Sequence, residues 1–289
     1  MEDFIVKIAV FPNLYKKNAI EYTQSVISTL QNFGAEIILT GEHKINFGED
    51  LEYYECKEEA VFHSDLCIAI GGDGTIIRFA KMAAKAKKPI LGINLGRLGF
   101  VSGMEQEELS KLKLLVSGDY KIEKRAMLSI DMELQNHKKR FYAFNDAVIS
   151  RGNEFKIADF NIFLNDSEIC NYMADGLILA TPTGSTAYSL SAGGPIVDSC
   201  MECILLTPIC SHSMFSRPAI FGKGSKISVK IGEREKEGIF ISLDGQEPIS
   251  MKDCNKVDIK LASHYVKLIN LGEGSFYQRL TDKLIRRKT

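Results

Sequence analysis

The sequence has neither a long apolar run nor an excess of charge of one sign. No stretch approaches the roughly 20 apolar residues that a membrane-spanning helix requires. The 36 Lys and Arg residues are nearly matched by 37 Asp and Glu residues, for a formal net charge of -1. Without a basic excess, neither nucleic acid nor a membrane surface is indicated as a partner. We therefore expect a soluble protein whose ligand binds at a local site.

Cysteine is also sparse. Seven cysteines in 289 residues form no dense disulfide framework, and an odd number is typical of a reducing compartment. The first residues are acidic where a signal peptide is basic, and they lack its long apolar core. A cytoplasmic protein is expected. A possible zinc site is formed by Cys200 and Cys203, which have C-x-x-C spacing, with Cys210 and His212, but the second half of a zinc pattern is missing. We therefore expect no protein-bound metal and interpret these cysteines as small buried apolar residues.

Several well-known motifs are absent. The chain has no G-x-x-x-x-G-K-[ST] and no G-x-G-x-x-G, so it is neither an ordinary P-loop protein nor a dehydrogenase with the usual fingerprint. Ser185 does not lie in a G-x-S-x-G context, and no histidine has the spacing of a catalytic triad. Acyl-transfer chemistry therefore has no support.

Short apolar runs alternate with helical periodicity over residues 1–122. The runs predict buried strands at 5–11, 37–39, 66–70 and 90–93. Between them, Tyr22 and Val26 share the apolar face of a helix that Gly34 ends, and another helix is expected after Thr75. Strands that alternate with helices indicate crossover connections and a parallel sheet covered on both faces. We predict an α/β, Rossmann-like N-terminal domain.

The period changes to two near the end of this domain. Apolar and polar residues alternate at 128–134, 227–231 and 257–261, which is typical of half-exposed strands. We predict an all-β, sandwich-like domain over 123–269. Helical spacing returns in 270–289, which predicts a C-terminal helix that packs back on the N-terminal domain.

Residues 71–75, here called the glycine turn, form the most informative segment. The sequence Gly71-Gly72-Asp73-Gly74-Thr75 lies between an apolar strand and an amphipathic helix, at the carboxyl end of a strand where α/β ligand sites lie. Glycines let the backbone approach a ligand, and free amides at a helix start bind phosphate oxygens. A carboxylate there repels phosphate unless it handles a cation or accepts a proton, and both uses suit phosphoryl transfer. A simple tight turn with Asp73 as helix N-cap remains the alternative.

Further segments resemble one family. The glycine turn alone is shared by NAD kinases, diacylglycerol kinases and sphingosine kinases, and more loosely by 6-phosphofructokinases. The chain resembles the NAD kinases in the following additional segments, in the same order: 94–100, Asn145-Asp146, the run Asp175 to Pro195, 208–210, Arg217-Pro218 and 244–246.

The resemblance implies ATP-dependent phosphorylation of the 2′-hydroxyl of the adenosine ribose of NAD to give NADP, with Asp73 as general base. It implies Mg²⁺ or another divalent ion carried by the nucleotide phosphates, and a homodimer or homotetramer. The residues expected to bind NAD are Asp73, Gly74, Arg78, Phe100, Asn145, Asp146, Lys156, Asp175, Thr186, Ala187, Tyr188, Ser191 and Gln246. Those expected to bind the phosphates of ATP are Gly71, Gly72, Gly74 and Thr75.

One position departs from the family. Many members carry Arg two residues before the position of Asp175, whereas this chain has Met173, which keeps the length and loses the charge. A weaker or rearranged phosphate contact is expected. Two rival functions remain open at this stage. A lipid kinase shares the glycine turn but needs an apolar lipid site, and a non-catalytic NAD sensor gains nothing from a carboxylate at Asp73.

Overall fold

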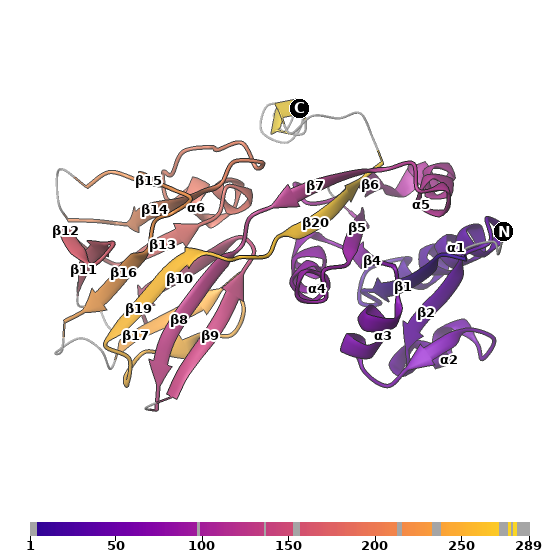
Figure 1. Cartoon of the computed structure of the whole chain (residues 1–289), viewed down its shortest axis with the longest axis horizontal. Helices are drawn as coiled ribbons and strands as arrows, with labels where there is room; N and C mark the ends of the chain where they lie inside the picture. Colours follow the sequence, from indigo (N-terminus) through magenta and orange to yellow (C-terminus); the bar gives the residue numbers. More distant parts are fainter. Residues whose placement is uncertain are drawn as a thin grey trace. The chain divides into compact units, whose positions relative to one another are not determined.

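The chain divides into two compact units, residues 1–125 with 264–289, and residues 126–263 (Figure 1). The computed structural model describes residues 5–96, 99–135, 137–152, 157–212, 216–232, 238–271, 277–278 and 280–281. No helix formed by these residues is long and apolar enough to span a bilayer.

The first unit is built on a mostly parallel sheet. Its strands are β1 (Lys7–Pro12), β2 (Glu36–Thr40), β3 (Glu52–Tyr54), β4 (Leu66–Gly71), β5 (Pro89–Asn94), β6 (Met104–Glu105), β7 (Lys121–Arg125) and β20 (Val266–Asn270). The spatial order is β3-β2-β1-β4-β5-β20-β7, with β6 beside β5 and only β7 antiparallel to its neighbour among the described strands. From β1 the chain continues to β2 on one side of the β1–β4 pair, and from β4 it continues to β5 on the other side. Ligands of such sheets bind outside the carboxyl ends of the strands at this divergence.

Helices cover both faces of this sheet. The helical segments are α1 (Ala19–Asn32), η1 (Gly41–His43), α2 (Lys44–Phe47), α3 (Lys57–His63), α4 (Asp73–Lys85), η2 (Gln106–Leu112) and α5 (Lys113–Ser117). Val10 packs with Val26 of α1 on one face, whereas the next residue, Phe11, stacks on Phe79 of α4 with ring centroids 4.4 Å apart. Alternating strand side chains are therefore buried on both sides, which explains the unbroken apolar runs in the sequence.

The second unit is a sandwich of two antiparallel sheets. One sheet has the order β15 (Ala219–Gly222), β14 (Cys203–Ile209), β13 (Gly176–Ala180), β10 (Asp146–Arg151), β17 (Ile239–Leu243) and β18 (Ile249–Ser250). The other has the order β12 (Ser167–Ala174), β11 (Ala158–Leu164), β16 (Ile227–Ile231), β19 (Lys256–Leu261), β8 (Leu128–Leu134) and β9 (His137–Ala143). Ile130 and Ile259 of one sheet join Ile149 and Leu177 of the other in a single buried cluster.

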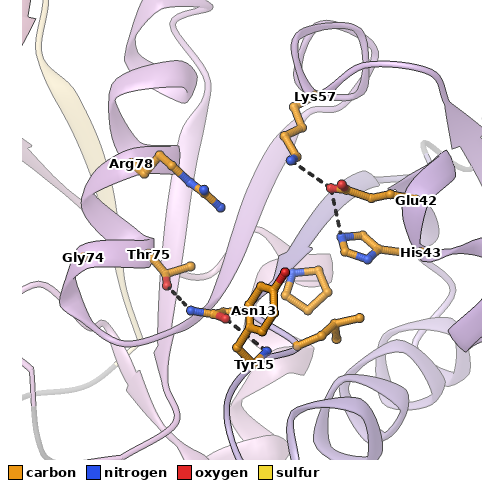
Figure 2. A pocket seen from close by; sticks show the side chains of 10 residues that line it. Asn13, Tyr15, Glu42, His43, Lys57, Gly74, Thr75 and Arg78 are labelled. Carbon is orange, nitrogen blue, oxygen red and sulfur yellow. Dashed lines mark hydrogen bonds and ion pairs between the residues drawn. The ribbon is translucent and has the colours of Figure 1, made fainter. Parts of the chain in front are cut away.

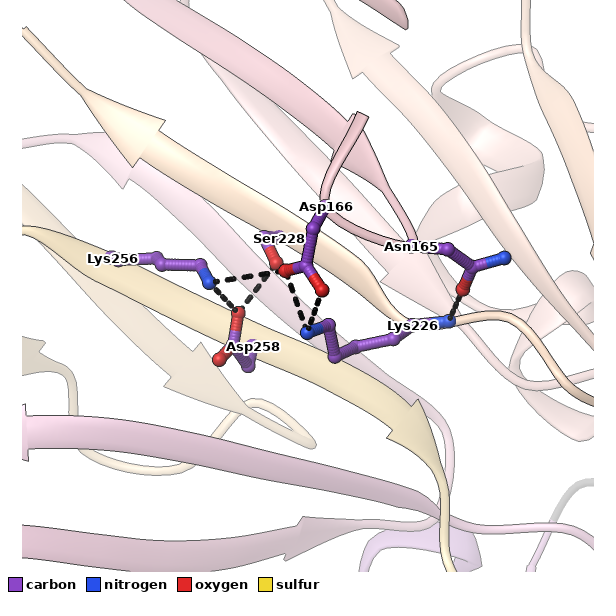
Figure 3. Close-up of polar contacts among 6 residues, drawn as sticks. All are labelled: Asn165, Asp166, Lys226, Ser228, Lys256 and Asp258. Atoms are coloured by element: carbon purple, nitrogen blue, oxygen red, sulfur yellow. Dashed lines mark hydrogen bonds and ion pairs between the residues drawn. The ribbon is translucent and has the colours of Figure 1, made fainter. Parts of the chain in front are cut away.

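The two sheets differ on their outer faces. Ile178 and Leu205, on the face of the β13 sheet that points away from the other sheet, are buried with Val197 of the segment that follows β13. On the second sheet, charged side chains pair with each other: Lys226 with Asp166 at 2.7 Å and Lys256 with Asp258 at 2.9 Å (Figure 3). These partly exposed pairs contribute little to stability.

The predicted α/β fold with a β-rich second part is confirmed. Details differ. Helix α4 begins at Asp73 rather than after Thr75, and the short elements β3 and α3 were not predicted. Strand β20, of which residues 266–269 fall within the expected all-β region 123–269, pairs with β5 and β7 of the first sheet. The helix expected over 270–289 lies mostly outside the described residues, and Asn270 itself ends β20.

Candidate active site

The glycine turn lies at the carboxyl end of β4, beside the end of β1. Strand β4 ends at Gly71 and α4 begins at Asp73, with Gly72 extended at the N-cap. A Cβ on Gly71 would stand 2.8 Å from the Thr75 side chain, whereas a Cβ on Gly74 would meet nothing within 4 Å. Gly71 therefore allows the tight turn, and the exposed backbone at Gly74 leaves the helix start open to a ligand. The amides there favour an anion.

Asp73 is fixed by the loop at 99–100. The amide of Phe100 donates a hydrogen bond to Oδ2 of Asp73 at 3.2 Å, and a Cβ on Gly99 would stand only 2.2 Å from Oδ1. Only glycine at position 99 allows this approach. Because Gly72 is the N-cap residue and receives no capping bond from a side chain, Asp73 does not serve as the helix cap. Gly99 was not predicted as a site residue.

Asn13 joins the end of β1 to the glycine turn. Its Nδ2 donates to Oγ1 of Thr75 at 2.9 Å, and its Oδ1 accepts from the amide of Tyr15 at 3.2 Å. The amide of Asn13 also donates to the carbonyl of Ile70 in β4 at 2.8 Å. These bonds hold the loop after β1 against the turn. Asn13 was not predicted as a site residue.

A cavity of about 590 Å³ opens beside the turn within the first unit. This volume lies within the roughly 300–1,000 Å³ of small-molecule sites. Figure 2 shows Arg78 extending from α4 toward the open space and Lys57 on another wall, where its Nζ contacts Oε1 of Glu42 at 2.8 Å. Two cations and a helix start thus face one cavity, an arrangement that suits phosphate groups.

The second unit holds the predicted pair Asn145 and Asp146 in a rigid turn. The carboxylate of Asp244 accepts hydrogen bonds from the backbone amides of Phe144 at 3.0 Å, Asn145 at 2.7 Å and Asp146 at 3.2 Å. Oδ1 of Asn145 is buried and has no hydrogen-bond partner among the described residues. This amide oxygen is therefore available to a ligand.

Asp146 is almost fully buried, at 5% exposure. Burial, and secondarily the neighbouring charge of Asp244, raises the pKa of Asp146 to about 7. Near neutral pH the carboxyl group is therefore protonated in a large fraction of molecules. A carboxyl group in this state both donates and accepts hydrogen bonds, which suits the edge of a purine ring.

The polar turn at 181–186 packs directly on Asn145. Oγ1 of Thr181 donates to the carbonyl of Phe144 at 2.7 Å, and a Cβ on Gly184 would stand 2.1 Å from the carbonyl oxygen of Asn145. Oγ1 of Thr183 is buried without a hydrogen-bond partner among the described residues. The two predicted segments thus form one polar surface.

The residues after this turn take different roles. Helix η3 (Thr183–Thr186) includes the half-buried Thr186, whose Oγ1 donates to the carbonyl of Thr183, and Ala187 follows it. Tyr188 and Ser191 lie in the short helix α6 (Tyr188–Ser191), and Tyr188 is 47% exposed, so its ring is free to stack on a ligand.

Asp175 forms an ion pair with Arg151, and the arginine holds the pKa of that carboxyl below its usual range. Arg151 was not predicted as a site residue. Met173, two residues earlier, is half exposed. Gln246 is exposed and follows Asp244 in the turn after β17, where its carbonyl accepts from the hydroxyl of Ser242 at 2.7 Å. Lys156 lies outside the described residues.

The cysteine interpretation was only partly correct. Cys203 is buried, as expected, but Cys200 and Cys210 are exposed. Cys210, which directly follows β14, has a positive φ of 46°.

The first unit combines a fixed carboxylate, a helix start and cations at one cavity. These features are typical of phosphotransferases that use a nucleotide. Two family models identify the particular family. Residues 6–120 match the ATP-NAD kinase N-terminal domain, and residues 144–271 match the ATP-NAD kinase C-terminal domain. The chain therefore belongs to the ATP-NAD kinase family, and its predicted class of enzyme, NAD kinase, is confirmed.

Relatives cover nearly the whole chain. The NAD kinase of Caldanaerobacter subterraneus subsp. tengcongensis is 39% identical over 97% of this chain and 99% of its own length. The NAD kinase of Campylobacter lari is 38% identical over 86% of this chain and 84% of its own length. This degree of identity extends through both units, which argues against a lipid kinase.

Two solved structures share the fold. Yeast NADH kinase complexed with NADH superposes with a TM-score of 0.88 at 27% identity, covering 100% of this chain and 89% of that chain. An NAD kinase from Archaeoglobus fulgidus in complex with ATP superposes with a TM-score of 0.73 at 23% identity, covering 96% of this chain and 97% of that chain. The latter likeness shows the fold alone.

Proposed function

We propose that this enzyme transfers the terminal phosphate of ATP to the 2′-hydroxyl of the adenosine ribose of NAD, and that the product is NADP. The observation that carries the proposal is the Asp73 carboxylate, held by the Phe100 amide at the start of α4 and next to a cationic cavity. Pure binding of a phosphate compound gains nothing from a fixed carboxylate, whereas activation of a hydroxyl uses a group that accepts its proton, and a carboxylate can do so.

The proposed chemistry is a single displacement at phosphorus. Asp73 accepts the proton of the 2′-hydroxyl, the oxygen forms a bond to the γ-phosphorus, and the bond from that phosphorus to the bridging oxygen of ADP breaks. The backbone of Gly71, Gly72, Gly74 and Thr75 shapes the turn around the phosphates. Its amides near the start of α4 stabilise the charge of the transferred group.

We propose that a divalent ion enters this site bound to the phosphates of the nucleotide. The described residues include no group of three or more His, Cys, Asp or Glu side chains that could hold a metal ion. We therefore propose that Mg²⁺ or another divalent ion arrives with the ATP phosphates. When bound it offsets phosphate charge. Arg78 adds a fixed positive charge from the second turn of α4.

In the proposed acceptor site, the buried groups of Asn145 and Asp146 bind the adenine edge. Thr186, Ala187, Tyr188 and Ser191 line the dinucleotide, with the Tyr188 ring available for stacking. Asp175 binds at the nicotinamide side. By resemblance alone, we also propose that the dinucleotide contacts Gly74, Phe100, Lys156 and Gln246.

The assay is direct. Purified protein is incubated with ATP, Mg²⁺ and NAD, and NADP formation is followed by a dehydrogenase specific for NADP. NADP should appear in proportion to enzyme. Parallel reactions contain NADH as acceptor, because yeast NADH kinase shares the fold closely, and diacylglycerol or sphingosine as lipid acceptors. Lipid phosphorylation without NADP would overturn the proposal.

We also propose a homodimer or homotetramer in the cytoplasm. Ile169 and Met173 on β12 and Ile220 on β15 are about half exposed, and both are edge strands of their sheets, as is common where strands meet a second copy. All seven cysteines are free thiols, which suits a reducing compartment. Light scattering after gel filtration measures the mass of the assembly, and a monomeric mass would contradict this part.

A further inference from the structure

Asp244 lies in a tight turn whose backbone does not require a carboxylate. The turn spans Leu243 to Gln246, and the amide of Gln246 donates to the carbonyl of Leu243 at 3.0 Å. Asp244 and Gly245 have positive φ values of 52° and 66°, as in a type I′ turn. Asn-Gly and Gly-Gly also form this turn. The turn alone therefore does not explain an aspartate at position 244.

The Asp244 carboxylate is directed at the start of β10. Its Oδ1 accepts hydrogen bonds from the backbone amides of Phe144 at 3.0 Å, Asn145 at 2.7 Å and Asp146 at 3.2 Å, and its Oδ2 accepts from Phe144 at 3.0 Å. Successive amides directed at one anion form a nest. Hydrogen bonds to a charged acceptor are roughly twice as strong as neutral ones. Asp244 therefore fixes the backbone at 144–146.

Other backbone bonds hold the same segment from both sides. The amide of Asp244 donates to the carbonyl of Asp146 at 2.9 Å, and the amide of Thr181 donates to the carbonyl of Asn145 at 2.8 Å. The side chains are less fully engaged. Oδ1 of Asn145 is buried and has no hydrogen-bond partner in the part of the chain that the structure describes. Such atoms are rare in folded proteins, so the fixed backbone holds this oxygen ready for a ligand.

Asp244 also acts on Asp146 through its charge. The neighbouring segments, β13, β17 and the turn at 181–186, contain no charged residue. Arg151, the other charged residue of β10, lies at the opposite end of that strand and pairs with Asp175. Burial, and secondarily the charge of Asp244, raises the pKa of Asp146, because a second negative charge is unfavourable beside the first.

We propose that Asp244 is the positioning residue of the acceptor site, with its carboxylate fixing the turn at 144–146 in the form in which Asn145 and Asp146 meet the dinucleotide. It acts through these two residues. The inference rests on the proposed binding of adenine by Asn145 and Asp146, and it deepens that proposal by making NAD binding depend on pH. As the pH rises through neutrality, the Asp146 carboxyl loses its proton and the hydrogen bond that it donates, so affinity for NAD falls.

Two substitutions separate position from charge. Asparagine and glycine both suit the positive φ at this position. Asp244→Asn keeps an oxygen that accepts from the amides and loses the charge, whereas Asp244→Gly loses both. The dissociation constant for NAD is measured by isothermal titration calorimetry between pH 5 and pH 8, without ATP. For the wild type it should rise above about pH 7, by at most about tenfold per pH unit.

The two variants should differ in their pH profiles. Asp244→Gly should weaken NAD binding about tenfold at every pH, because the turn loses its charge-assisted bonds. Asp244→Asn should stay within about twofold of the wild type near pH 5, where Asp146 is protonated in both proteins. Its affinity should begin to fall at a lower pH, because only burial then opposes ionisation of Asp146. A purely structural defect would not move this midpoint.

Asp146→Asn tests whether the effect passes through Asp146. Without a titrating group at this position, the dissociation constant for NAD should be independent of pH between pH 5 and pH 8. Adding Asp244→Asn to this variant should leave the profile flat. KM for NAD should follow the binding curve of Asp244→Asn, while KM for ATP stays within about twofold.

The matched control is Asp166→Asn. Asp166 also lies in a turn of the second unit with a positive φ, of 70°, and its carboxylate pairs with Lys226. This variant loses the same charge, and its dissociation constant for NAD should stay within about twofold of the wild-type value at every pH. Circular dichroism verifies that each variant is folded, and Asp244→Asn decides the question if Asp244→Gly does not fold.

Two results would overturn the assignment. One is wild-type affinity for NAD in folded Asp244→Gly. The other is a pH profile of Asp244→Asn that superimposes on that of the wild type. Calorimetry needs no turnover, so the assignment and the proposed reaction fail separately. The expected binding profiles without NADP formation would support the assignment and contradict the reaction, whereas no binding of NAD by the wild type at any pH would overturn both.

Discussion

The guanidinium of Arg151 and the carboxylate of Asp175 form an ion pair with 2.8 Å between Nε and Oδ1. Arg151 ends β10 and Asp175 links β12 to β13, and the amide of Arg151 also donates to the carbonyl of Asp175 at 3.1 Å. In many relatives an arginine is expected two residues before this aspartate, where this chain has Met173. The ion pair therefore places a guanidinium beside Asp175 from a different strand.

We predict that Arg151→Gln raises KM for NAD by about three- to tenfold with a smaller change in kcat, because Asp175 loses the partner that orients it. Met173→Arg should lower KM for NAD, and the double variant should recover part of the loss if either guanidinium can serve. Steady-state kinetics with NAD varied at saturating ATP measure this. An unchanged KM for NAD in both single variants would remove any role for positive charge at this place.

Asp73→Asn tests the general base. The substitution keeps the size of the side chain and its bond from the Phe100 amide but removes the proton acceptor. Turnover should fall by about 10²–10⁴-fold, the usual contribution of a general base, while the dissociation constant for NAD measured by calorimetry stays within about twofold. Turnover equal to that of the wild type would eliminate the proposed role.

Gly99→Ala tests the support of that base. A Cβ at this position would stand 2.2 Å from Oδ1 of Asp73, so either the carboxylate or the loop must move. A displacement of about 1 Å near reacting atoms lowers the rate on the order of 10²-fold. We therefore expect kcat to fall by about this factor. The control is Gly224→Ala, because a Cβ there meets nothing within 4 Å. Equal losses in the two variants would mean that Gly99 matters only for folding.

The sequence predicted the parts of the site that depend on neighbouring residues. Gly71 to Thr75 lie between a strand and a helix within one short segment, so the periodicities on both sides place them at a strand end. Resemblance supplied Asn145 and Asp146 as a pair. In both cases the chemistry is visible in consecutive residues.

The missed residues are those whose contacts span long stretches of chain. Asn13 reaches Thr75 across 62 positions, and Asp244 reaches Asn145 across 99. Such contacts follow from strand order and register, which local periodicity does not encode. Lys57 illustrates a second limit: α3 buries only Ala60 and Val61, too few apolar positions for a recognisable helical period.

Strand β20 shows a third limit. Its buried residues Val266 and Leu268 flank the half-exposed Lys267, as in the strands of the sandwich, although Ile269 is buried as well. The period identifies a strand but not the sheet in which it pairs. The structure pairs β20 with β5 and β7, and Leu268 of β20 lies opposite Ile90 of β5.

The buried carboxyl of Asp146 predicts a specific dependence of stability on pH. Its pKa of about 7 in the folded protein lies above the value of about 3.9 in an unfolded chain. Between these values the folded state binds more protons than the unfolded state. The stabilising contribution of this group is therefore fully present below about pH 4 and is lost as the pH rises through 7.

Asp146→Asn should abolish this dependence, because the amide does not ionise in this range. Relative to the wild type, the variant should gain free energy of unfolding from pH 5 to about pH 7, by at most about 1.4 kcal/mol per pH unit, and the difference should be level by pH 8. Urea denaturation followed by circular dichroism across this range measures the difference. Asp166→Asn is the control: Asp166 is exposed and paired with Lys226, which lowers its pKa, so its effect should be constant above pH 5. If the Asp146→Asn difference is equally constant, the carboxyl is already ionised in the folded protein and its proposed role as a hydrogen-bond donor to adenine is wrong.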